Sequence, residues 1–330
     1  MQAPARHSPN PIEFVRAIWG LAGTCTPLPG DVDENWRLDT ATGSFALKIA
    51  SKESSLARLA AEARVQATLH EEGWPVPGPC AVPAGRGHGR YVAPAEHRPT
   101  GGWARLSTWV PGTPWSETPE PGERFGRVLG RFLARLDREL DAFEEPELEA
   151  THAWDLLSAD AALESLEAIH DAARRARVER WLAAFVEHEL PSLRARRLHL
   201  VHNDANDHNV LVEDGAIGGL LDFGDMLSTV RVAEPAIAAA YLAQRSREPV
   251  GDARALLAAY EEEYPLHPEE RVTFVACLRA RLMQTVITAA ARAAQRDDAY
   301  ASVHAAPAWD VLDRWETSGW ERLAEELRAR

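Results

Sequence analysis

Two neighbouring segments in the middle of the chain contain residue types that can move a phosphoryl group. The first reads LHLVHNDANDHNVLV from residue 198, and the second reads AIGGLLDFGD from residue 216. Apolar runs at 210–212 and 219–221, joined by a turn with Asp214-Gly215, predict a β-hairpin. Antiparallel pairing would place Asn209, just before the first strand, beside Asp222, just after the second. Amide and carboxylate oxygens suit magnesium, which takes few protein ligands beside phosphates and water. Asn209 and Asp222 are therefore the predicted metal ligands.

A second carboxylate lies in the loop that leads into this hairpin. Asp204 is five residues before Asn209 and follows the apolar strand predicted at 198–201. In phosphoryl transfer, a carboxylate near the metal orients the attacking hydroxyl and accepts its proton. Asp204 is therefore the predicted catalytic base. His202, two residues earlier, is expected to hold the loop by hydrogen bonds.

The alternative interpretation is an ordinary hairpin flanked by polar loop residues, since Asp, Asn and His are common in turns. A His-x-Asp-x(4)-Asn pattern followed by a strand and Asp-Phe-Gly is far more specific than any of its parts. The other histidines of the segment, His199 and His208, are expected to have structural or solvent-facing roles. Asp207 and Asp225 could bind a substrate ammonium group or could stabilise loops and helix ends, and both options stay open.

The same pattern resembles the aminoglycoside phosphotransferase and choline kinase-like superfamily, whose members are distant relatives of protein kinases. The particular residues of the two segments are most similar to those of its hydroxylysine kinase-like branch. Four further segments are similar to that branch: LKIA from residue 47, RLSTWVPG from 105, WDL from 154 and AWDVL from 308. The resemblance implies an α+β, two-lobe, protein-kinase-like fold with a small antiparallel-sheet N-lobe and a largely helical C-lobe. It also implies ATP as the phosphoryl donor and Mg2+ as the metal.

Within the N-terminal part, Lys48 is a charge in the apolar strand predicted at 45–49. In kinase-like folds a strand lysine contacts the α- and β-phosphates and pairs with a helix glutamate. Glu62 is the predicted partner, because helical spacing puts it on the same stripe as Leu59 and Val65, where a lone carboxylate would be costly. The alternative is a solvated i,i+4 pair between Arg58 and Glu62.

The nucleotide-binding turn before Lys48 lacks the Gly-x-Gly-x-x-Gly sequence, as is frequent in this superfamily. The turn at 29–35 reads PGDVDEN. Its acidic side chains are expected to face solvent or the substrate, with Asn35 or backbone amides facing phosphate; these acidic residues are Asp31, Asp33 and Glu34. The adenine is expected to lie against the backbone of 107–110, which includes Thr108 and Val110.

The elements that must position these residues divide near 101–114. Strand-like runs before this point predict an N-terminal nucleotide-binding lobe at 1–108, and a helical catalytic and substrate-binding lobe follows at 109–330. A chain of 330 residues suits two lobes that share a cleft. Helical periodicity is predicted at 12–21, 54–72, 123–143, 159–173, 177–188, 233–243, 253–263, 269–294 and 308–328.

Composition limits the partners and the compartment. With 36 basic and 50 acidic residues the formal net charge is -14, which argues against a nucleic-acid partner and suits a cationic substrate. Cys25, Cys80 and Cys277 are odd in number and far apart, which predicts a reducing compartment. Residues 1–11 lack the apolar run of a signal peptide, and no stretch is expected to reach membrane-spanning length. We expect a cytoplasmic protein that is a monomer or a homodimer.

The expected activity is phosphorylation of a small-molecule hydroxyl. The acceptor implied by the resemblance is an amino alcohol or hydroxy amino acid, as for a hydroxylysine, homoserine or choline kinase, or an aminoglycoside. One alternative is a catalytically inactive, nucleotide-binding pseudokinase module on the same fold. Another is a metal-dependent phosphohydrolase built on His202 and Asp204, which would want several His/Asp clusters for two metals.

Overall fold

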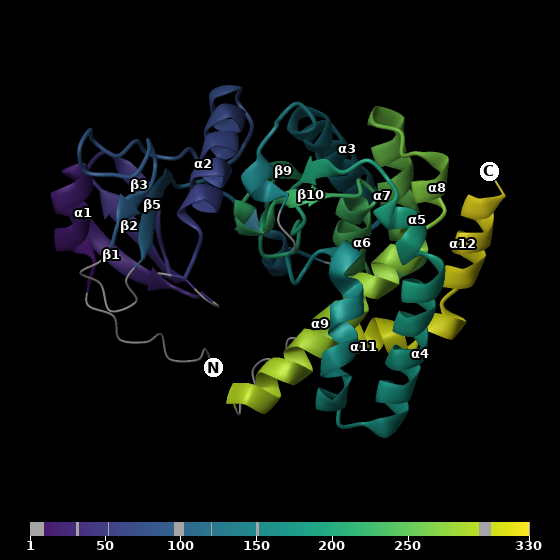
Figure 1. The fold of residues 1–330 in the computed structure, drawn as a ribbon. Helices are drawn as coiled ribbons and strands as arrows, with labels where there is room; N and C mark the ends of the chain where they lie inside the picture. Colours follow the sequence, from purple (N-terminus) through teal and green to yellow (C-terminus); the bar gives the residue numbers. More distant parts are fainter. Residues whose placement is uncertain are drawn as a thin grey trace. The chain divides into compact units, whose positions relative to one another are not determined.

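The computed structural model describes residues 10–30, 33–51, 53–95, 102–119, 121–149, 152–296 and 305–329. The chain folds into two compact units. The sheet unit comprises Met1–Gly112 together with Gly219–Gly224, and the helical unit comprises Thr113–Gly218 and Asp225–Arg330 (Figure 1). The lobe boundary at residue 108 stays a prediction. A short returning segment of the chain, Gly219–Gly224, is attached to the sheet unit, where the Leu220 N–H donates to the Pro75 carbonyl at 2.9 Å.

The sheet unit is built on one antiparallel sheet with the strand order β1-β2-β3-β5-β4. Its strands are β1 (Gly23–Leu28), β2 (Glu34–Thr40), β3 (Gly43–Ala50), β4 (Ala93–Pro94) and β5 (Trp103–Thr108). In β3, Leu47 and Ile49 are buried on one face. Because side chains alternate along a strand, Lys48 between them points to the opposite face.

Two helices accompany this sheet, α1 (Ile12–Trp19) and α2 (Leu56–Glu71). Helix α2 begins at the N-cap Ser55, whose side chain accepts a hydrogen bond from the Arg58 N–H. Its buried stripe includes Leu59, Glu62 and Val65. Glu62 therefore points inward, as its spacing predicts.

Beyond the five-stranded sheet, the chain has short strands among many helices. Strand β7 (His199–Val201) pairs antiparallel with β10 (Leu227–Thr229), and β6 (Thr113–Pro114), β8 (Val210–Glu213) and β9 (Ala216–Leu220) form a second small sheet. The α-helices are α3 (Glu123–Leu140), α4 (Ala172–His188), α5 (Leu190–Arg194), α6 (Ala233–Arg245), α7 (Pro249–Glu263), α8 (Pro268–Arg271), α9 (Phe274–Arg296), α11 (Ala306–Asp313) and α12 (Trp320–Arg328). The 3-10 helices are η1 (Trp115–Glu117), η2 (Pro146–Leu148), η3 (Leu156–Ala168), η4 (Phe223–Asp225) and η5 (Trp315–Thr317). An antiparallel-sheet part followed by a largely helical part confirms the predicted fold class.

Helix α9 corrects the expectation that no stretch reaches membrane-spanning length. Among the residues that the structure describes, Phe274–Ala294 is one helical stretch long and apolar enough to cross a membrane by length and composition. Within the protein, 61% of an 18-residue part of this stretch is buried. Helix α9 packs against α6, α11 and η3 (Figure 1). A core helix with such neighbours is expected to be as apolar as a membrane span.

Helices α3 and α7 pack closely because glycines line their contact. A Cβ atom at Gly126 would lie 2.7 Å from the Asp252 carbonyl oxygen, and one at Gly130 would lie 2.2 Å from the Leu256 carbonyl oxygen. Contacts this short cannot be relieved by moving a flexible side chain, since the obstacle is backbone. The two glycines therefore set how closely the helices approach.

A buried acidic pair lies behind the loop that follows β7. Glu234, in the first turn of α6, is fully buried and accepts a hydrogen bond from the Asn203 N–H at 2.6 Å. The His202 N–H also bonds to this carboxylate. Asn203 has a φ of 65°, a left-handed conformation that costs energy for a residue with a side chain. Glu234 therefore holds a strained piece of backbone in place.

The second acid of the pair is Asp137 on α3, which accepts a hydrogen bond from the Tyr260 hydroxyl at 2.5 Å. Burial raises the pKa of Glu234 to about 7, against the hydrogen bonds from Asn203 and His202 and the charge of Arg281. Burial, together with the charge of Glu234, raises the pKa of Asp137 well above its usual range. Two buried carboxyls close enough to affect each other do not both ionise readily at neutral pH.

We expect the contribution of Glu234 to the free energy of unfolding to fall as the pH rises from about 4.5 to 7. In this window the folded Glu234 keeps its proton and the unfolded one, with a pKa of 4.5, does not, so the folded state binds more protons. Glu234→Gln should flatten the profile, which urea unfolding between pH 5 and 8 would measure. The exposed Glu325→Gln is the control and should follow the wild type. Parallel profiles for wild type and Glu234→Gln would contradict the assignment.

Gly130→Ala is expected to destabilise the protein by about 2 kcal/mol, because the added methyl group overlaps the backbone of α7. Gly251→Ala in α7 is the matched control: its added Cβ meets only a Glu123 side-chain oxygen at 3.4 Å, and alanine favours the helix. Urea denaturation of both variants measures the difference. Equal stability of the two would show that the α3–α7 contact is looser than described.

Candidate active site

In the sheet unit, Lys48 forms an ion pair with Asp222. Lys48 Nζ lies 2.8 Å from Asp222 Oδ1 and 3.6 Å from Asp33 Oδ2. Asp222 has a φ of 54°, and the same Oδ1 accepts a hydrogen bond from the Gly224 N–H at 3.3 Å. The Asp-Phe-Gly segment is thus a tight turn that presents its carboxylate to a strand lysine.

This ion pair stays charged over the ordinary pH range. Burial opposes ionisation of Asp222, but the charge and hydrogen bond of Lys48 outweigh it and lower the pKa of Asp222 to about 2. Burial likewise opposes the charge of Lys48, but the charge and hydrogen bond of Asp222 together with the charge of Asp33 outweigh it, so the pKa of Lys48 is raised. The pair therefore offers a cation suited to a phosphate and an anion suited to a metal ion.

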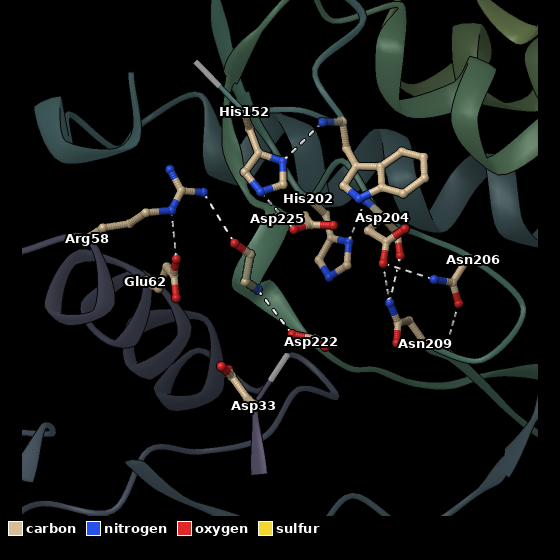
Figure 2. Close-up of polar contacts among 12 residues, drawn as sticks. Asp33, Arg58, Glu62, His152, His202, Asp204, Asn206, Asn209, Asp222 and Asp225 are labelled. Atoms are coloured by element: carbon tan, nitrogen blue, oxygen red, sulfur yellow. Dashed lines mark hydrogen bonds and ion pairs between the residues drawn. The ribbon is translucent and has the colours of Figure 1, made fainter. Parts of the chain in front are cut away.

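The predicted pairing of Lys48 with Glu62 is wrong. Glu62 Oε2 lies 2.7 Å from Arg105 Nη1. Its Oε1 lies 3.1 Å from Arg58 Nε (Figure 2). Arg105 is the direct partner of Lys48 in the β3–β5 register, so it reaches the same face of the sheet. Burial raises the pKa of Glu62 against the charges of both arginines. The buried carboxylate is thus compensated by two guanidinium groups, and Lys48 turns to Asp222.

The acidic turn also differs from expectation. Asp33, expected to face solvent or substrate, is directed at Lys48, with 17% of its side chain exposed. The Asn35 side chain donates to the Pro29 carbonyl at 3.2 Å and so closes the turn between β1 and β2. Asp31 lies outside the described residues. A phosphate group bound to Lys48 would therefore lie close to the carboxylate of Asp33.

The predicted adenine segment is tied to its neighbours by its backbone. The Thr108 N–H donates to the Gly78 carbonyl at 2.9 Å, and its hydroxyl accepts from the Gly78 N–H at 2.8 Å. The Trp109 N–H donates to the Ser44 carbonyl at 3.0 Å. Val110 follows β5 and is partly buried. A contact between this segment and adenine stays a prediction, and it would use backbone groups other than these two N–H groups.

In the helical unit, the loop after β7 gathers its polar side chains on Asp204. Asp204 Oδ2 accepts hydrogen bonds from Asn206 Nδ2 at 2.9 Å and from Asn209 Nδ2 at 2.8 Å (Figure 2). Asn209 Nδ2 also donates to the Asp204 carbonyl at 3.0 Å. Since the amide hydrogens of Asn209 are used in this way, its amide oxygen is the atom that can serve a cation.

His202 lies behind this loop and is fully buried. Its Nδ1 accepts a hydrogen bond from the Asp204 N–H at 3.3 Å. The side chain thus fixes the backbone at the predicted base, and the buried ring is not placed to meet a substrate. The contacts suit the loop-holding role expected from the sequence.

Two residues at this loop were not predicted. Asn206 accepts hydrogen bonds on its side-chain oxygen from the N–H groups of His208 and Asn209, a local turn that its spacing in the motif could have indicated. Arg281 on α9 places Nη2 3.0 Å from Asp204 Oδ1 and is 1% exposed. Nothing local in the sequence points from Asp204 to an arginine 77 residues later.

The remaining polar residues of the segment have partners within the helical unit. Asp207 lies 3.4 Å from Arg245 Nη1, and its carbonyl accepts from the Ser116 N–H at 2.7 Å. Asp225 lies 3.4 Å from His152 Nε2 (Figure 2). These contacts favour loop stabilisation over substrate binding for both aspartates. The two histidines are held in the same way, His208 by Ser116 at 3.1 Å and His199 by Asp141 at 2.7 Å.

Comparison with known proteins gives relatives with named activities. Hydroxylysine kinase from Bos taurus is 27% identical over 338 residues, covering 94% of this chain and 90% of the relative. Homoserine kinase from Zymomonas mobilis is 26% identical over 179 residues, covering 52% of this chain and 54% of the relative. These similarities agree with the branch indicated by the motifs.

The fold is similar to that of solved structures at low sequence identity. The amicoumacin kinase hAmiN, solved with AMP-PNP, Ca2+ and Ami, has a TM-score of 0.68 and 16% identity, covering 91% of each chain. The predicted kinase-like fold is therefore confirmed. Residues 24–271 match the phosphotransferase enzyme family. The matched residues include both the sheet with Lys48 and the loop with Asp204. The chain belongs to the phosphotransferase enzyme family, whose members transfer a phosphoryl group to a hydroxyl acceptor.

Proposed function

We propose that the protein is an ATP- and magnesium-dependent kinase that phosphorylates the hydroxyl group of a hydroxy amino acid or amino alcohol. The observation that carries the proposal is the environment of Asp204. Its carboxylate accepts hydrogen bonds from three side chains, those of Asn206, Asn209 and Arg281. Its side chain remains 17% exposed, so it can meet a substrate. A fixed and accessible carboxylate is what a hydroxyl acceptor requires.

Lys48 is the proposed phosphate-binding residue. It carries a stable positive charge in the sheet, and its present partners Asp222 and Asp33 are anions, as phosphate groups are. ATP as the donor is supported by the AMP-PNP bound to the amicoumacin kinase, whose fold this chain shares. Asp33 would give way to the phosphates when the nucleotide binds. Glu62 supports this site indirectly, by holding Arg105 and Arg58.

Asn209 and Asp222 are the proposed magnesium ligands. Both supply hard oxygen atoms: the amide oxygen of Asn209 is turned away from Asp204, and Asp222 keeps its charge at any ordinary pH. Along the chain, Asn209 directly precedes strand β8 and Asp222 follows strand β9, as the proposed hairpin requires. When bound, the ion would neutralise charge on the phosphates.

Asp204 would orient the acceptor hydroxyl and take its proton. The acceptor oxygen bonds to the γ-phosphorus, the bond from that phosphorus to the bridging oxygen breaks, and ADP leaves. The N–H hydrogen bonds that Asp204 accepts hold its carboxylate in place, so it would be a well-positioned base. A loose transition state suits such a base, since most of the acceleration comes from positioning and charge neutralisation.

The acceptor class is inferred from relatives and charge. Two relatives are named after the substrates hydroxylysine and homoserine, and each of these molecules carries a hydroxyl and an ammonium group. The net charge of -14 favours a cationic acceptor over an anionic one. A cytoplasmic location, where ATP and such amino acids are available, is part of this proposal.

ADP release in the presence of candidate acceptors tests the function. Hydroxylysine, homoserine, ethanolamine, choline and an aminoglycoside would each be added to enzyme, ATP and magnesium. We expect a hydroxy amino acid or an amino alcohol to raise the rate above that without acceptor, and expect chelation of magnesium to abolish the increase. Stimulation by the aminoglycoside alone would show that the proposed acceptor class is wrong. ADP release that no acceptor changes would contradict the kinase assignment.

Two substitutions separate the base from the metal ligand. Asp204→Asn should bind magnesium-ATP with unchanged affinity but lose turnover by about two to four orders of magnitude, the range for general-base catalysis. Asp222→Ala should weaken binding of magnesium-ATP as well, because it removes a metal ligand. ATP titrations at fixed magnesium and single-turnover rates measure both effects, with circular dichroism as the folding control. Equal loss of nucleotide affinity in the two variants would make Asp204 a metal ligand.

A further inference from the structure

Arg281 is a buried cation that forms an ion pair with Asp204 and contacts two aromatic rings. It lies on α9 with 1% of its side chain exposed, and Nη2 is 3.0 Å from Asp204 Oδ1. Nη1 donates to the Trp154 carbonyl at 3.0 Å. The guanidinium carbon lies 4.6 Å from the centre of the Trp154 ring and 5.8 Å from that of the Tyr241 ring. The guanidinium group is thus fixed from several directions before it meets the carboxylate.

We propose that Arg281 is a positioning residue for phosphoryl transfer, which sets the orientation of the Asp204 carboxylate toward the acceptor hydroxyl. This inference rests on the proposed role of Asp204 as catalytic base. Arg281 does not itself touch the substrate, because almost none of its side chain is exposed.

The division of the carboxylate oxygens supports this role. Oδ2 accepts hydrogen bonds from Asn206 and Asn209, which belong to the same loop as Asp204 and move with it. Oδ1 is held by Arg281, which comes from a different element in the core of the helical unit. Arg281 therefore relates the carboxylate to the rigid helices, whereas the two asparagines relate it only to its own loop.

The cost of burying the arginine points the same way. A guanidinium group taken out of water costs several kcal/mol, which is recovered only when good partners compensate the charge. A purely apolar residue could fill the space between Trp154 and Tyr241 without that cost. A charged residue at this position is explained by what it does for Asp204, because the charge-assisted hydrogen bond from Nη2 fixes the position of Oδ1.

Arg281→Met and Arg281→Lys test the proposal, with Arg279→Met as the matched control. Arg279 lies on the same helix and also stacks on two aromatic rings, those of Trp181 and Trp315, so it matches Arg281 in residue type and aromatic contacts. We expect Arg281→Met to lower kcat by about 10- to 100-fold, the scale of a misplaced catalytic group, with KM for ATP within about threefold of wild type. Arg281→Lys should recover at least about half of the lost kcat on a logarithmic scale, and Arg279→Met should retain wild-type kcat.

Stability measurements keep the test independent of activity. In a double-mutant cycle, Asp204→Asn and Arg281→Met should be coupled by about 5-fold or more in the unfolding equilibrium constant, and Asp204→Asn and Arg279→Met should be additive. Additivity of the first pair would overturn the inference. So would an Arg281→Met variant with wild-type kcat, or one in which kcat and nucleotide affinity fall together. A wild-type protein without kinase activity but with the coupling would refute the proposed function and leave only a structural ion pair.

Discussion

The backbone N–H of Asn203 donates a hydrogen bond of 2.6 Å to the carboxylate of Glu234, which is fully buried at the start of α6. Asn203 has a left-handed backbone conformation, with a φ of 65°, and this hydrogen bond stabilises it. His202 before it and Asp204 after it take their directions from this one residue. The histidine ring turns into the core, and the aspartate turns to where solvent reaches it. This hydrogen bond therefore helps to hold the loop in the arrangement that the proposed chemistry requires.

The same principle organises the charges in each unit. A buried charge needs a partner of opposite sign, and the choice of partner determines what remains for function. In the sheet unit, Arg105 compensates Glu62, and Lys48 is thereby directed at Asp222. In the helical unit, Arg281 holds one oxygen of Asp204. In both units an arginine pairs with a carboxylate, and the residue with the proposed chemical role stays partly exposed.

Local patterns in the sequence were sufficient to predict the secondary structure of the motif and of the segments around it. The hairpin of β8 and β9, the loop that joins Asp204 to Asn209 and the inward direction of Glu62 all follow from spacing and turn residues. Strand β1 escaped prediction because its composition is mixed and it contains Pro27, which is tolerated at the edge of a sheet. The helix expected at 159–173 is instead the 3-10 helix η3 followed by α4, which begins after the N-cap Asp171.

What the sequence could not supply are pairings set by register and by contacts distant in the chain. The partner of Glu62 depends on which residue of β5 lies opposite Lys48, and no periodicity reveals that register. The contact of Arg281 with Asp204 depends on how α9 packs against its neighbours. Glu234 was not singled out either, because a glutamate in the first turn of a helix is ordinary on the basis of charge alone.

Hydrogen exchange at the Asn203 amide tests most directly whether the buried carboxylate holds the loop. The measurement is native-state exchange of this amide in wild type and in Glu234→Ala, compared with amides inside α6. If Glu234 holds the loop, the Asn203 amide in the wild type exchanges about as slowly as those core amides. In Glu234→Ala it should exchange at least about tenfold faster relative to them. Fast exchange of the Asn203 amide in the wild type, like that of the exposed Asp214-Gly215 turn, would contradict the account.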